Sequence, residues 1–233
     1  TPLYSSAASD VYKRQARLRA GASLSGVTRE LNAALGTRHS IWPMSDDPVP
    51  TIVHTADGPL AFQHYFVRDR CAPGVTGFEF RHAAAARPLP EVLALLEDPA
   101  LVGIILCPSN PFVSIDPILA VPGLRAALRA SAAPVVAVSP IIAGLALKGP
   151  TAKMMAELAV PATAAAVAAH YGDLLDGFVL DLQDSDLLGG FRGTQLPAIA
   201  APTVMLTLPD KVRLATIVCE FARELRVARR AAS

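Results

Sequence analysis

Residues 101–110 constrain the fold more than any other part of the chain. The first six, LVGIIL, form an apolar run typical of a short strand that is buried on both faces, as in a parallel sheet. Pro108 and Pro111 then follow three residues apart, and neither a strand ladder nor a regular helix continues through such a pair. The sequence therefore predicts a buried strand that ends abruptly in a rigid polar loop.

That polar loop is a candidate binding site. Ser109 and Asn110 lie between the two prolines and offer a hydroxyl, an amide and free backbone N–H groups. Ligands of open α/β sheets bind where the strands end, at their carboxyl edge. The loop thus suits a phosphate or a nucleotide. The alternative is a plain turn built from turn-forming residues, and this stretch alone leaves both open.

Strands and helices alternate from this point on. We expect further strands at residues 134–138, 177–181 and 203–206, and helices at 123–130, 150–158, 163–175 and 210–229. Such alternation predicts a parallel sheet with right-handed crossovers. Thr207 and Asp210 form a capping-box pattern at the start of the closing amphipathic helix. The predicted fold class is α/β, a Rossmann-like and mostly parallel sheet with flanking helices.

The N-terminal half predicts a small insertion that contains a β-hairpin. The expected elements are a helix with Ser23 as its N-cap, strands around an Ala-Asp-Gly-Pro turn and a short helix, at residues 23–35, 40–44, 51–55, 60–66, 75–80 and 90–97. Residues 1–15 have neither a helical nor a strand period and are expected to be a non-native lead-in; the alternative is a genuine N-terminus. Residues 16–233 would then form one α/β domain.

Composition excludes several classes of partner. The net charge is +1, with scattered basic residues, so there is no electrostatic footprint for nucleic acid. Hydrophobic residues make up 52% of the chain, yet no apolar run reaches the roughly 18 residues of a membrane span. The three cysteines are odd in number and far apart, which fits reduced thiols and a cytoplasmic location.

Other polar residues stand at the ends of predicted elements. Asp46 and Asp47 are adjacent, and paired carboxylates suit Mg²⁺ or substrate hydroxyls, although turn capping is the alternative. Lys148 precedes a predicted helix and suits a phosphate, the alternative being a solvated loop lysine. The five histidines lack metal-binding spacing, and the chain has no Walker loop and no G-x-S-x-G motif.

Several ordered motifs between about Arg17 and Leu187 resemble the 2-phospho-L-lactate transferase family of coenzyme F-420 biosynthesis. They are PMSDDPV (43–49), FQHYFVRDRC (62–71), CPSNPFVSIDPILAVPGLRAAL (107–128), APVVAVSPII (133–142), ALKGPTAKMM (146–155) and HYGDLLDGFVLD (170–181). Together such long motifs are specific, whereas no single one would be.

The resemblance implies a reaction and its participants. A phospholactyl or phosphoenolpyruvyl group would pass from a guanosine-diphosphate-activated donor to a hydroxyl of the deazaflavin Fo, giving the F-420 core and GMP with help from Mg²⁺. From their places in the sequence we expect nucleotide or phosphate binding by Ser109, Asn110, Ser114, Ser139 and Lys148, and acceptor or metal binding by Asp46 and Asp47. The partners are thus small molecules, and the resemblance leaves room for a homodimer.

The sequence also departs from the family pattern. The family's Gly-rich phosphate loop and the acidic segment that follows it are not found here, so we expect the C-terminal two-thirds of an enzyme, inactive by itself. At Ala143-Gly144-Leu145 the sequence departs again, because the family's own version of this segment is richer in Gly and Lys. Two alternatives stay open, a sugar-nucleotide-binding regulator of the related gluconeogenesis-factor type and an inactive fragment.

Overall fold

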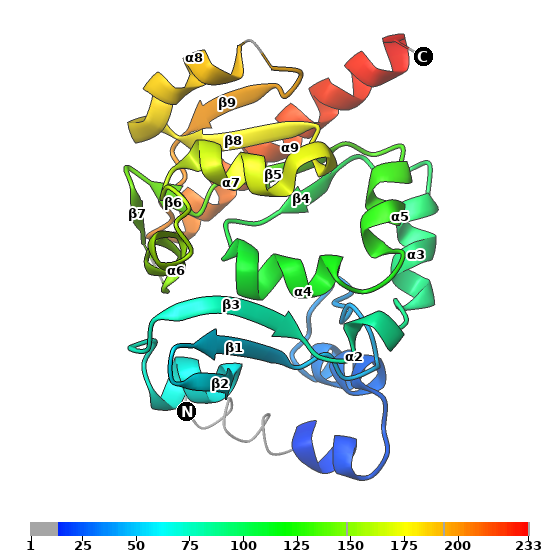
Figure 1. Ribbon diagram of the computed structural model, residues 1–233. Coiled ribbons are helices and arrows are strands. Elements are labelled where there is room, and N and C mark those ends of the chain that lie inside the picture. Colours follow the sequence, from blue (N-terminus) through cyan, green and yellow to red (C-terminus); the bar gives the residue numbers. More distant parts are fainter. Residues whose placement is uncertain (1–13, 148, 193, 233) are drawn as a thin grey trace.

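The computed structural model describes residues 14–147, 149–192 and 194–232. It contains a four-stranded parallel sheet and a three-stranded antiparallel sheet, with helices between and around them (Figure 1). Most of the predicted lead-in at residues 1–15 lies outside the described residues, as does Lys148.

The parallel sheet confirms the predicted fold class. Its strands run in the order β4-β5-β8-β9, and every neighbouring pair is parallel. The strands are β4 (Ile104–Leu106), β5 (Val135–Val138), β8 (Gly177–Asp181) and β9 (Ala198–Ala201). Sequential strands therefore lie side by side, with all their carboxyl ends at one edge, as in a Rossmann-like protein.

The prediction of the last strand is wrong by five residues. We expected a strand at residues 203–206, but β9 ends at Ala201 and the chain is irregular from Pro202 to Leu206. Proline has no N–H for the ladder, so Pro202 ends the strand. The alanines of β9 are weak strand formers, and pairing with β8 selects them instead.

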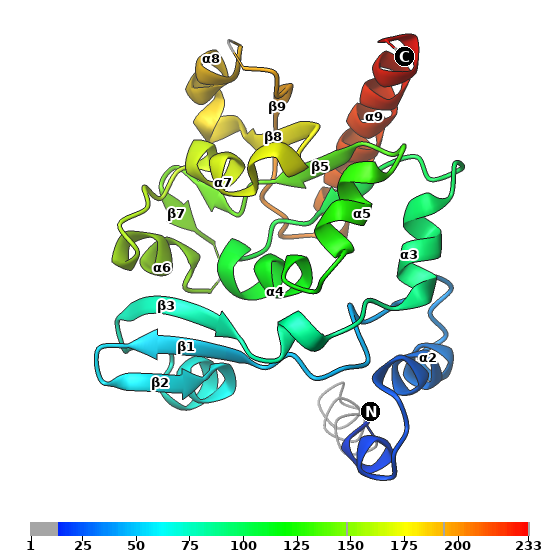
Figure 2. The ribbon, with the colours of Figure 1, turned by 45° about the vertical axis from the view of Figure 1, so that its right-hand side comes forward.

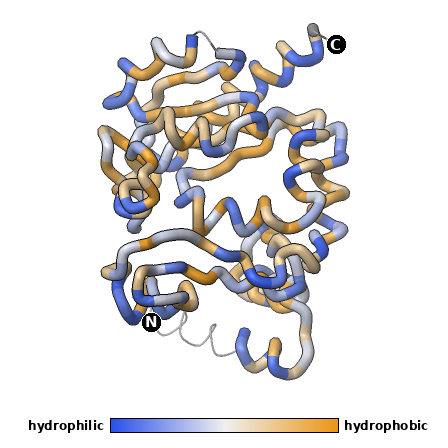
Figure 3. The backbone as a smooth tube through the Cα atoms, viewed as in Figure 1, coloured by the Kyte–Doolittle hydropathy of each residue, from blue (hydrophilic) through white to orange (hydrophobic). Residues whose placement is uncertain are grey.

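The two faces of the parallel sheet are buried against different helices. Val135 and Ala137 belong to the main core with residues of α7 (Ala164–Tyr171), whereas Val136 and Val138 pack with α9 (Leu208–Ala232). Alternate residues of a strand point to opposite faces, so β5 is covered on both sides. Figure 2 shows α7 and α9 on either side of the sheet, and Figure 3 shows the largely hydrophobic colour of its strands.

Two glycines let α9 lie close to the sheet. A Cβ at Gly103 would come within 2.7 Å of the Cβ of Ala222, and one at Gly177 within 2.6 Å of Leu225 Cδ1. The start of α9 carries the predicted capping box: Asp210 Oδ2 accepts the Thr207 N–H at 2.8 Å, and the Asp210 N–H donates to Thr207 Oγ1 at 3.3 Å. Both features fix the helix along the sheet.

The antiparallel sheet confirms the predicted insertion with a hairpin. Its strands are β1 (Thr51–Thr55), β2 (Gly58–Ala61) and β3 (Val75–Phe80), in the order β2-β1-β3. The prediction of a strand over residues 60–66 is wrong beyond Ala61, because His64–Arg68 forms a π-helical turn that buries Tyr65. The strand expected at residues 40–44 is also wrong; only Ser45 makes a bridge, to Pro88.

Most of the remaining helices lie close to their predicted positions, but the short helices at residues 116–119 and 188–191 were not predicted. Ser23 caps α2 by accepting the Gly26 N–H, as expected. The bounds are α2 (Leu24–Ala34), α3 (Pro90–Glu97), α4 (Asp116–Leu119), α5 (Leu124–Ala130), α6 (Thr151–Glu157) and α8 (Leu188–Phe191), with π-helical or 3₁₀ turns at Ala83–Ala85, Pro111–Ile115, Gly172–Leu174 and Leu182–Leu187. A small hairpin of β6 (Ile141–Ile142) and β7 (Leu145–Ala146) was not predicted.

Within the described ranges, no single helix is long and apolar enough to cross a membrane. Two helical segments, Pro111–Leu119 and Leu124–Ala130, are together long and apolar enough for a membrane span, but the chain bends by 84° between them.

Candidate functional site

Asn110 caps the turn that follows β4. It lies at the end of this strand, as the sequence predicts. Asn110 Oδ1 accepts the N–H groups of Phe112 at 2.9 Å and Val113 at 3.3 Å, which caps the π-helical turn that follows. Its Nδ2 lies 3.2 Å from the sulfur of Met154 on α6. The side chain therefore joins the β4 loop to α6, and both of its polar ends already have protein partners.

Two serines of the same loop are differently placed. Ser109 is half-buried directly before Asn110, and Ser114 is exposed on the π-helical turn. Among residues 14–147, 149–192 and 194–232, neither hydroxyl takes part in a hydrogen bond. Both hydroxyls are therefore open to a ligand, and Ser109 lies the nearer to the strand end.

Ser139 closes the turn after β5. Its side chain is buried, its hydroxyl donates to the Ile141 carbonyl at 2.8 Å, and it accepts the Ile141 N–H at 3.1 Å. Its own N–H donates to the Val179 carbonyl of β8 at 2.8 Å. Ser139 thus lies at the predicted strand end, with its hydroxyl engaged in opening the β6–β7 hairpin.

The last residue of β8 is a buried carboxylate, Asp181. It accepts the Gln183 N–H at 3.0 Å, the Thr203 N–H at 2.9 Å and the Thr203 hydroxyl at 2.7 Å. Burial alone would raise the pKa of Asp181, but the hydrogen bonds from Gln183 and Thr203 outweigh it and hold the pKa below its ordinary value. Asp181 therefore stays ionised and ties the end of β8 to the segment after β9.

A second carboxylate, in the turn that follows β8, reaches the β6–β7 hairpin. Asp184 is 8% exposed, and its two oxygens accept the Ala143 N–H at 3.1 and 3.0 Å. No motif marked Asp184, because its partner lies 41 residues away and only the pairing of β5 with β8 brings the two turns together. Neighbouring strand-end loops are thus linked to one another by side chains.

Asp46 and Asp47 point to different partners. Asp46 accepts the Ser25 N–H at 2.6 Å and the Ser25 hydroxyl at 2.7 Å, at the start of α2. Asp47 accepts the Arg87 N–H at 2.9 Å. In the part of the chain that the structure describes, no three His, Cys, Asp or Glu side chains are grouped as metal ligands. Each carboxylate thus serves a different segment of the chain, and the binding of an acceptor or a metal by Asp46 and Asp47 stays a prediction.

His170 and Asp116 form a pair that sequence reasoning missed. His170 Nε2 lies 2.9 and 3.0 Å from the two Asp116 oxygens, and the imidazole meets the Phe112 ring edge-on at 5.2 Å. The pair connects α7 to α4, directly behind the loop that Asn110 caps. No spacing signal could have found it, since the two residues are 54 positions apart.

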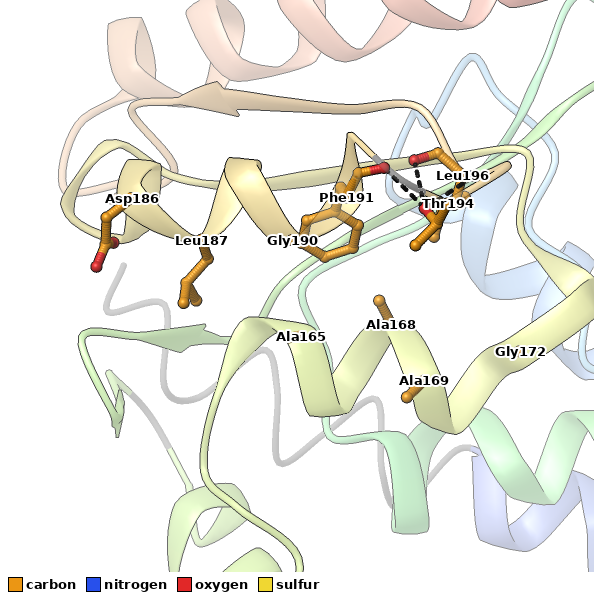
Figure 4. A pocket seen from close by; sticks show the side chains of 10 residues that line it. All are labelled: Ala165, Ala168, Ala169, Gly172, Asp186, Leu187, Gly190, Phe191, Thr194 and Leu196. Carbon is orange, nitrogen blue, oxygen red and sulfur yellow. Dashed lines mark hydrogen bonds between the residues drawn. The ribbon is translucent and has the colours of Figure 1, made fainter.

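An apolar groove of about 490 Å³ lies between α7 and α8 (Figure 4). Ala165, Ala168 and Ala169 form one wall, while Leu187 and Phe191 form the other. Asp186 marks one end, and the Thr194 hydroxyl, which donates to the Phe191 carbonyl at 2.9 Å, marks the other. None of the predicted site residues that the structure describes lines this groove, so those residues and the groove are separate features.

The fold and the strand-end turns together define a Rossmann-like α/β protein with a built polar edge, the place where such sheets bind ligands. The family comparison makes the assignment more specific. Residues 12–188 match the model of the family "2-phospho-L-lactate transferase CofD". The chain belongs to this family.

Two curated relatives agree with the assignment. The chain is 37% identical over 203 residues to the 2-phospho-L-lactate transferase of Methanosarcina mazei, which covers 87% of this chain and 66% of the relative. It is 38% identical over 218 residues to the phosphoenolpyruvate transferase of Kitasatospora aureofaciens, covering 91% of this chain and 67% of the relative. The chain thus spans slightly less than two thirds of the M. mazei protein.

A solved structure agrees in fold. The crystal structure of a UPF0052 family member from Bacillus halodurans superposes with a TM-score of 0.55 at 17% identity, covering 82% of this chain and 66% of that one. At this identity the similarity supports the α/β architecture alone.

Proposed function

We propose that the protein transfers a phospholactyl or phosphoenolpyruvyl group from a guanosine-diphosphate-activated donor to the deazaflavin Fo, and that the products are the F-420 core and GMP. The observation that carries the proposal is the family match over residues 12–188. Because one relative is named for phospholactate and another for phosphoenolpyruvate, the proposal includes both acids.

The reaction is a substitution at phosphorus. A ribityl hydroxyl of Fo forms a bond to the phosphorus that carries the three-carbon acid. The bond from that phosphorus to the oxygen bridging it to the GMP phosphate breaks, and the hydroxyl proton is lost. Such a reaction depends mainly on alignment of the two substrates and on stabilisation of phosphate charge. A rigid set of polar turns at one sheet edge supplies the alignment.

We assign different parts of this task to the strand-end residues. Ser109 and Ser114 offer hydroxyls that the described protein does not use, so we propose that they bind the donor phosphates. Asn110 and Ser139 shape the backbone of their turns through the bonds described above. Lys148 remains a predicted phosphate ligand from its place before α6, and it lies outside the described residues.

The predicted acceptor residues and metal need separate tests. Asp46 and Asp47 stay candidates for positioning Fo, with the carboxylates held as described. The requirement for Mg²⁺ stays a prediction. Comparing turnover with Mg²⁺ and with EDTA would check it.

The decisive experiment offers the protein its proposed substrates. We expect GDP to bind weakly in calorimetry. Fo plus the activated donor is then assayed for the F-420 core and GMP by mass spectrometry; product would support the transferase and would refute the expectation that this chain is inactive by itself. Donors carrying phospholactate and phosphoenolpyruvate are run in parallel, which identifies the acid. Binding of a uridine-diphosphate sugar without GDP binding would instead favour the regulatory alternative, and would refute the transferase proposal.

A further inference from the structure

The β6–β7 hairpin has an unusual tip for its sequence. Ile142 pairs with Leu145, so the turn has two residues, Ala143 and Gly144, with φ angles of +48° and +78°. A two-residue hairpin with both central φ angles positive favours Asn or Gly at each position. Gly144 meets this demand freely, but Ala143 carries a Cβ that disfavours the left-handed region. Something outside the turn must therefore stabilise Ala143.

The side chain of Asp184 provides that stabilisation. Both of its oxygens lie at hydrogen-bond distance from the Ala143 N–H, and the carboxylate is 8% exposed. A buried, charged acceptor makes a stronger hydrogen bond than a neutral one in water. The contact joins the turn after β8 to the hairpin after β5, and hence two neighbouring strand ends.

The hairpin also packs against α6 and α7. It follows Ser139, the residue after β5, and α6 begins at Thr151, five residues after β7 ends. β6 is buried at Ile141 and Ile142 and contacts α7 and β8, whereas β7 contacts α6. Figure 1 shows β6, β7 and α6 together at the end of the parallel sheet. Met154 of α6 then reaches the Asn110 amide at 3.2 Å.

We propose that Asp184 is a positioning residue of the transferase site, acting through the Ala143 N–H on the hairpin and thereby on α6 and the Asn110 loop. The proposal rests on the proposed function, because it is that site which the hairpin would shape. Asp184 itself would touch no substrate. Its removal should weaken donor binding by releasing the loops that surround the strand ends.

The test compares Asp184→Ala with Asp186→Ala, a matched control whose carboxylate is exposed two residues further on. Hydrogen exchange of the peptide over residues 141–147 should be at least tenfold faster in Asp184→Ala and unchanged in the control. The dissociation constant for GDP should rise at least tenfold in the same variant only. Unchanged exchange or unchanged GDP affinity in Asp184→Ala would overturn the proposal.

Two further variants change Ala143, the exposed donor of the hydrogen bond to Asp184, and test whether Asp184 acts through it. Ala143→Pro removes the N–H donor and cannot adopt a positive φ, so it should reproduce both effects without disturbing a buried residue. Adding Ala143→Gly to Asp184→Ala should recover most of the lost affinity, because glycine needs no help in this turn. Failure of glycine to recover it would show that Asp184 acts by another route.

The outcomes separate this inference from the proposed function. If the unmodified protein binds no GDP and forms no product, the proposed function is refuted, while the exchange measurement still reports whether Asp184 holds the hairpin. If the unmodified protein binds GDP and Asp184→Ala binds it equally well, the function stands and the positioning role is wrong.

Discussion

Two hydrogen bonds join Asp181 at the end of β8 to Thr203 just after β9. Asp181 Oδ2 accepts the Thr203 N–H at 2.9 Å and the Thr203 hydroxyl at 2.7 Å. Both side chains are buried. Thr203 lies just after β9 and is not part of the strand. Its N–H and its hydroxyl donate to the Asp181 carboxylate at the end of β8 instead of to a neighbouring strand.

The first prediction concerns this pair and pH. Thr203→Val removes the hydroxyl donor and should lower the free energy of unfolding by about 1–2 kcal/mol at pH 7. Because folding lowers the pKa of Asp181, its hydrogen bonds stabilise the protein above the unfolded value of about 3.9. That stabilisation is lost as the pH falls through the lowered pKa. The difference in unfolding free energy between the unmodified protein and Thr203→Val should therefore shrink in that pH range.

Urea unfolding at pH 7 and at decreasing pH below 4 would measure this difference. Thr216→Val is a suitable control, since its hydroxyl donates to the Val212 carbonyl on the exposed face of α9. Equal effects of the two substitutions at pH 7 would contradict the importance of the Asp181 pair.

The second prediction concerns the close approach of α9. Gly177→Ala would place a Cβ 2.6 Å from Leu225 Cδ1 and 2.7 Å from Phe221 Cε1, so the helix must shift. Overpacking of this kind costs about 1–3 kcal/mol. Gly189→Ala, in α8 with nothing within 4 Å of the added Cβ, is the control and should be neutral or slightly stabilising. Thermal unfolding of both variants decides the point.

The third prediction separates contact with the donor from loop shape. Ser109→Ala removes a hydroxyl that has no partner in the described chain, and it should raise the GDP dissociation constant at least tenfold, about 1.4 kcal/mol, without lowering stability. Asn110→Ala should weaken GDP to a similar extent and also lose about 1 kcal/mol of stability, because the cap is removed.

Asn110→Asp keeps the capping oxygen and loses only the amide next to Met154. It should therefore retain stability, so its calorimetric affinity shows what the amide does in binding. If Ser109→Ala binds GDP as tightly as the unmodified protein, Ser109 is not a donor ligand.

The fourth prediction concerns Asp46. Asp46→Ala deprives the Ser25 N–H and hydroxyl of their acceptor and should weaken the first turn of α2 by about 0.5–2 kcal/mol. Hydrogen exchange over residues 24–28 should therefore be faster than in Asp47→Ala, whose carboxylate serves Arg87 instead. An increased KM for Fo in Asp46→Asn with unchanged exchange would instead indicate a direct acceptor contact.

The sequence predicts the parallel sheet well because its signals are local. The buried run before Pro108 and the sequence GFVLD at residues 177–181 are apolar, short and sharply bounded, and β8 occupies the predicted residues. Of the six apolar residues predicted as a strand, 101–106, only the last three form β4 (Ile104–Leu106). Where composition is ambiguous, as in the alanines of β9, tertiary pairing decides and a local pattern cannot.

The strand-end positions of the candidate residues were predictable from the sequence, but their hydrogen bonds were not. Strand-end turns at Ser109 and Ser139 followed from abrupt changes in composition. The use of Ser139 by its own turn, and of Asp46 by Ser25, depends on neighbours that the fold supplies. The β6–β7 hairpin did leave a local signal, since Ala143-Gly144 separates two apolar pairs, and Gly is common in such turns.

The position of α9 has a consequence for how the chain folds. Ala222 packs at Gly103 and Arg226 donates to the Pro99 carbonyl, contacts that close loops of more than a hundred residues. Contacts so distant in sequence form slowly, because the intervening chain must first lose its freedom. During synthesis, β4, β5 and β8 would leave the ribosome with one hydrophobic face uncovered until α9 emerges. This interval is when the nascent chain most needs protection by a chaperone.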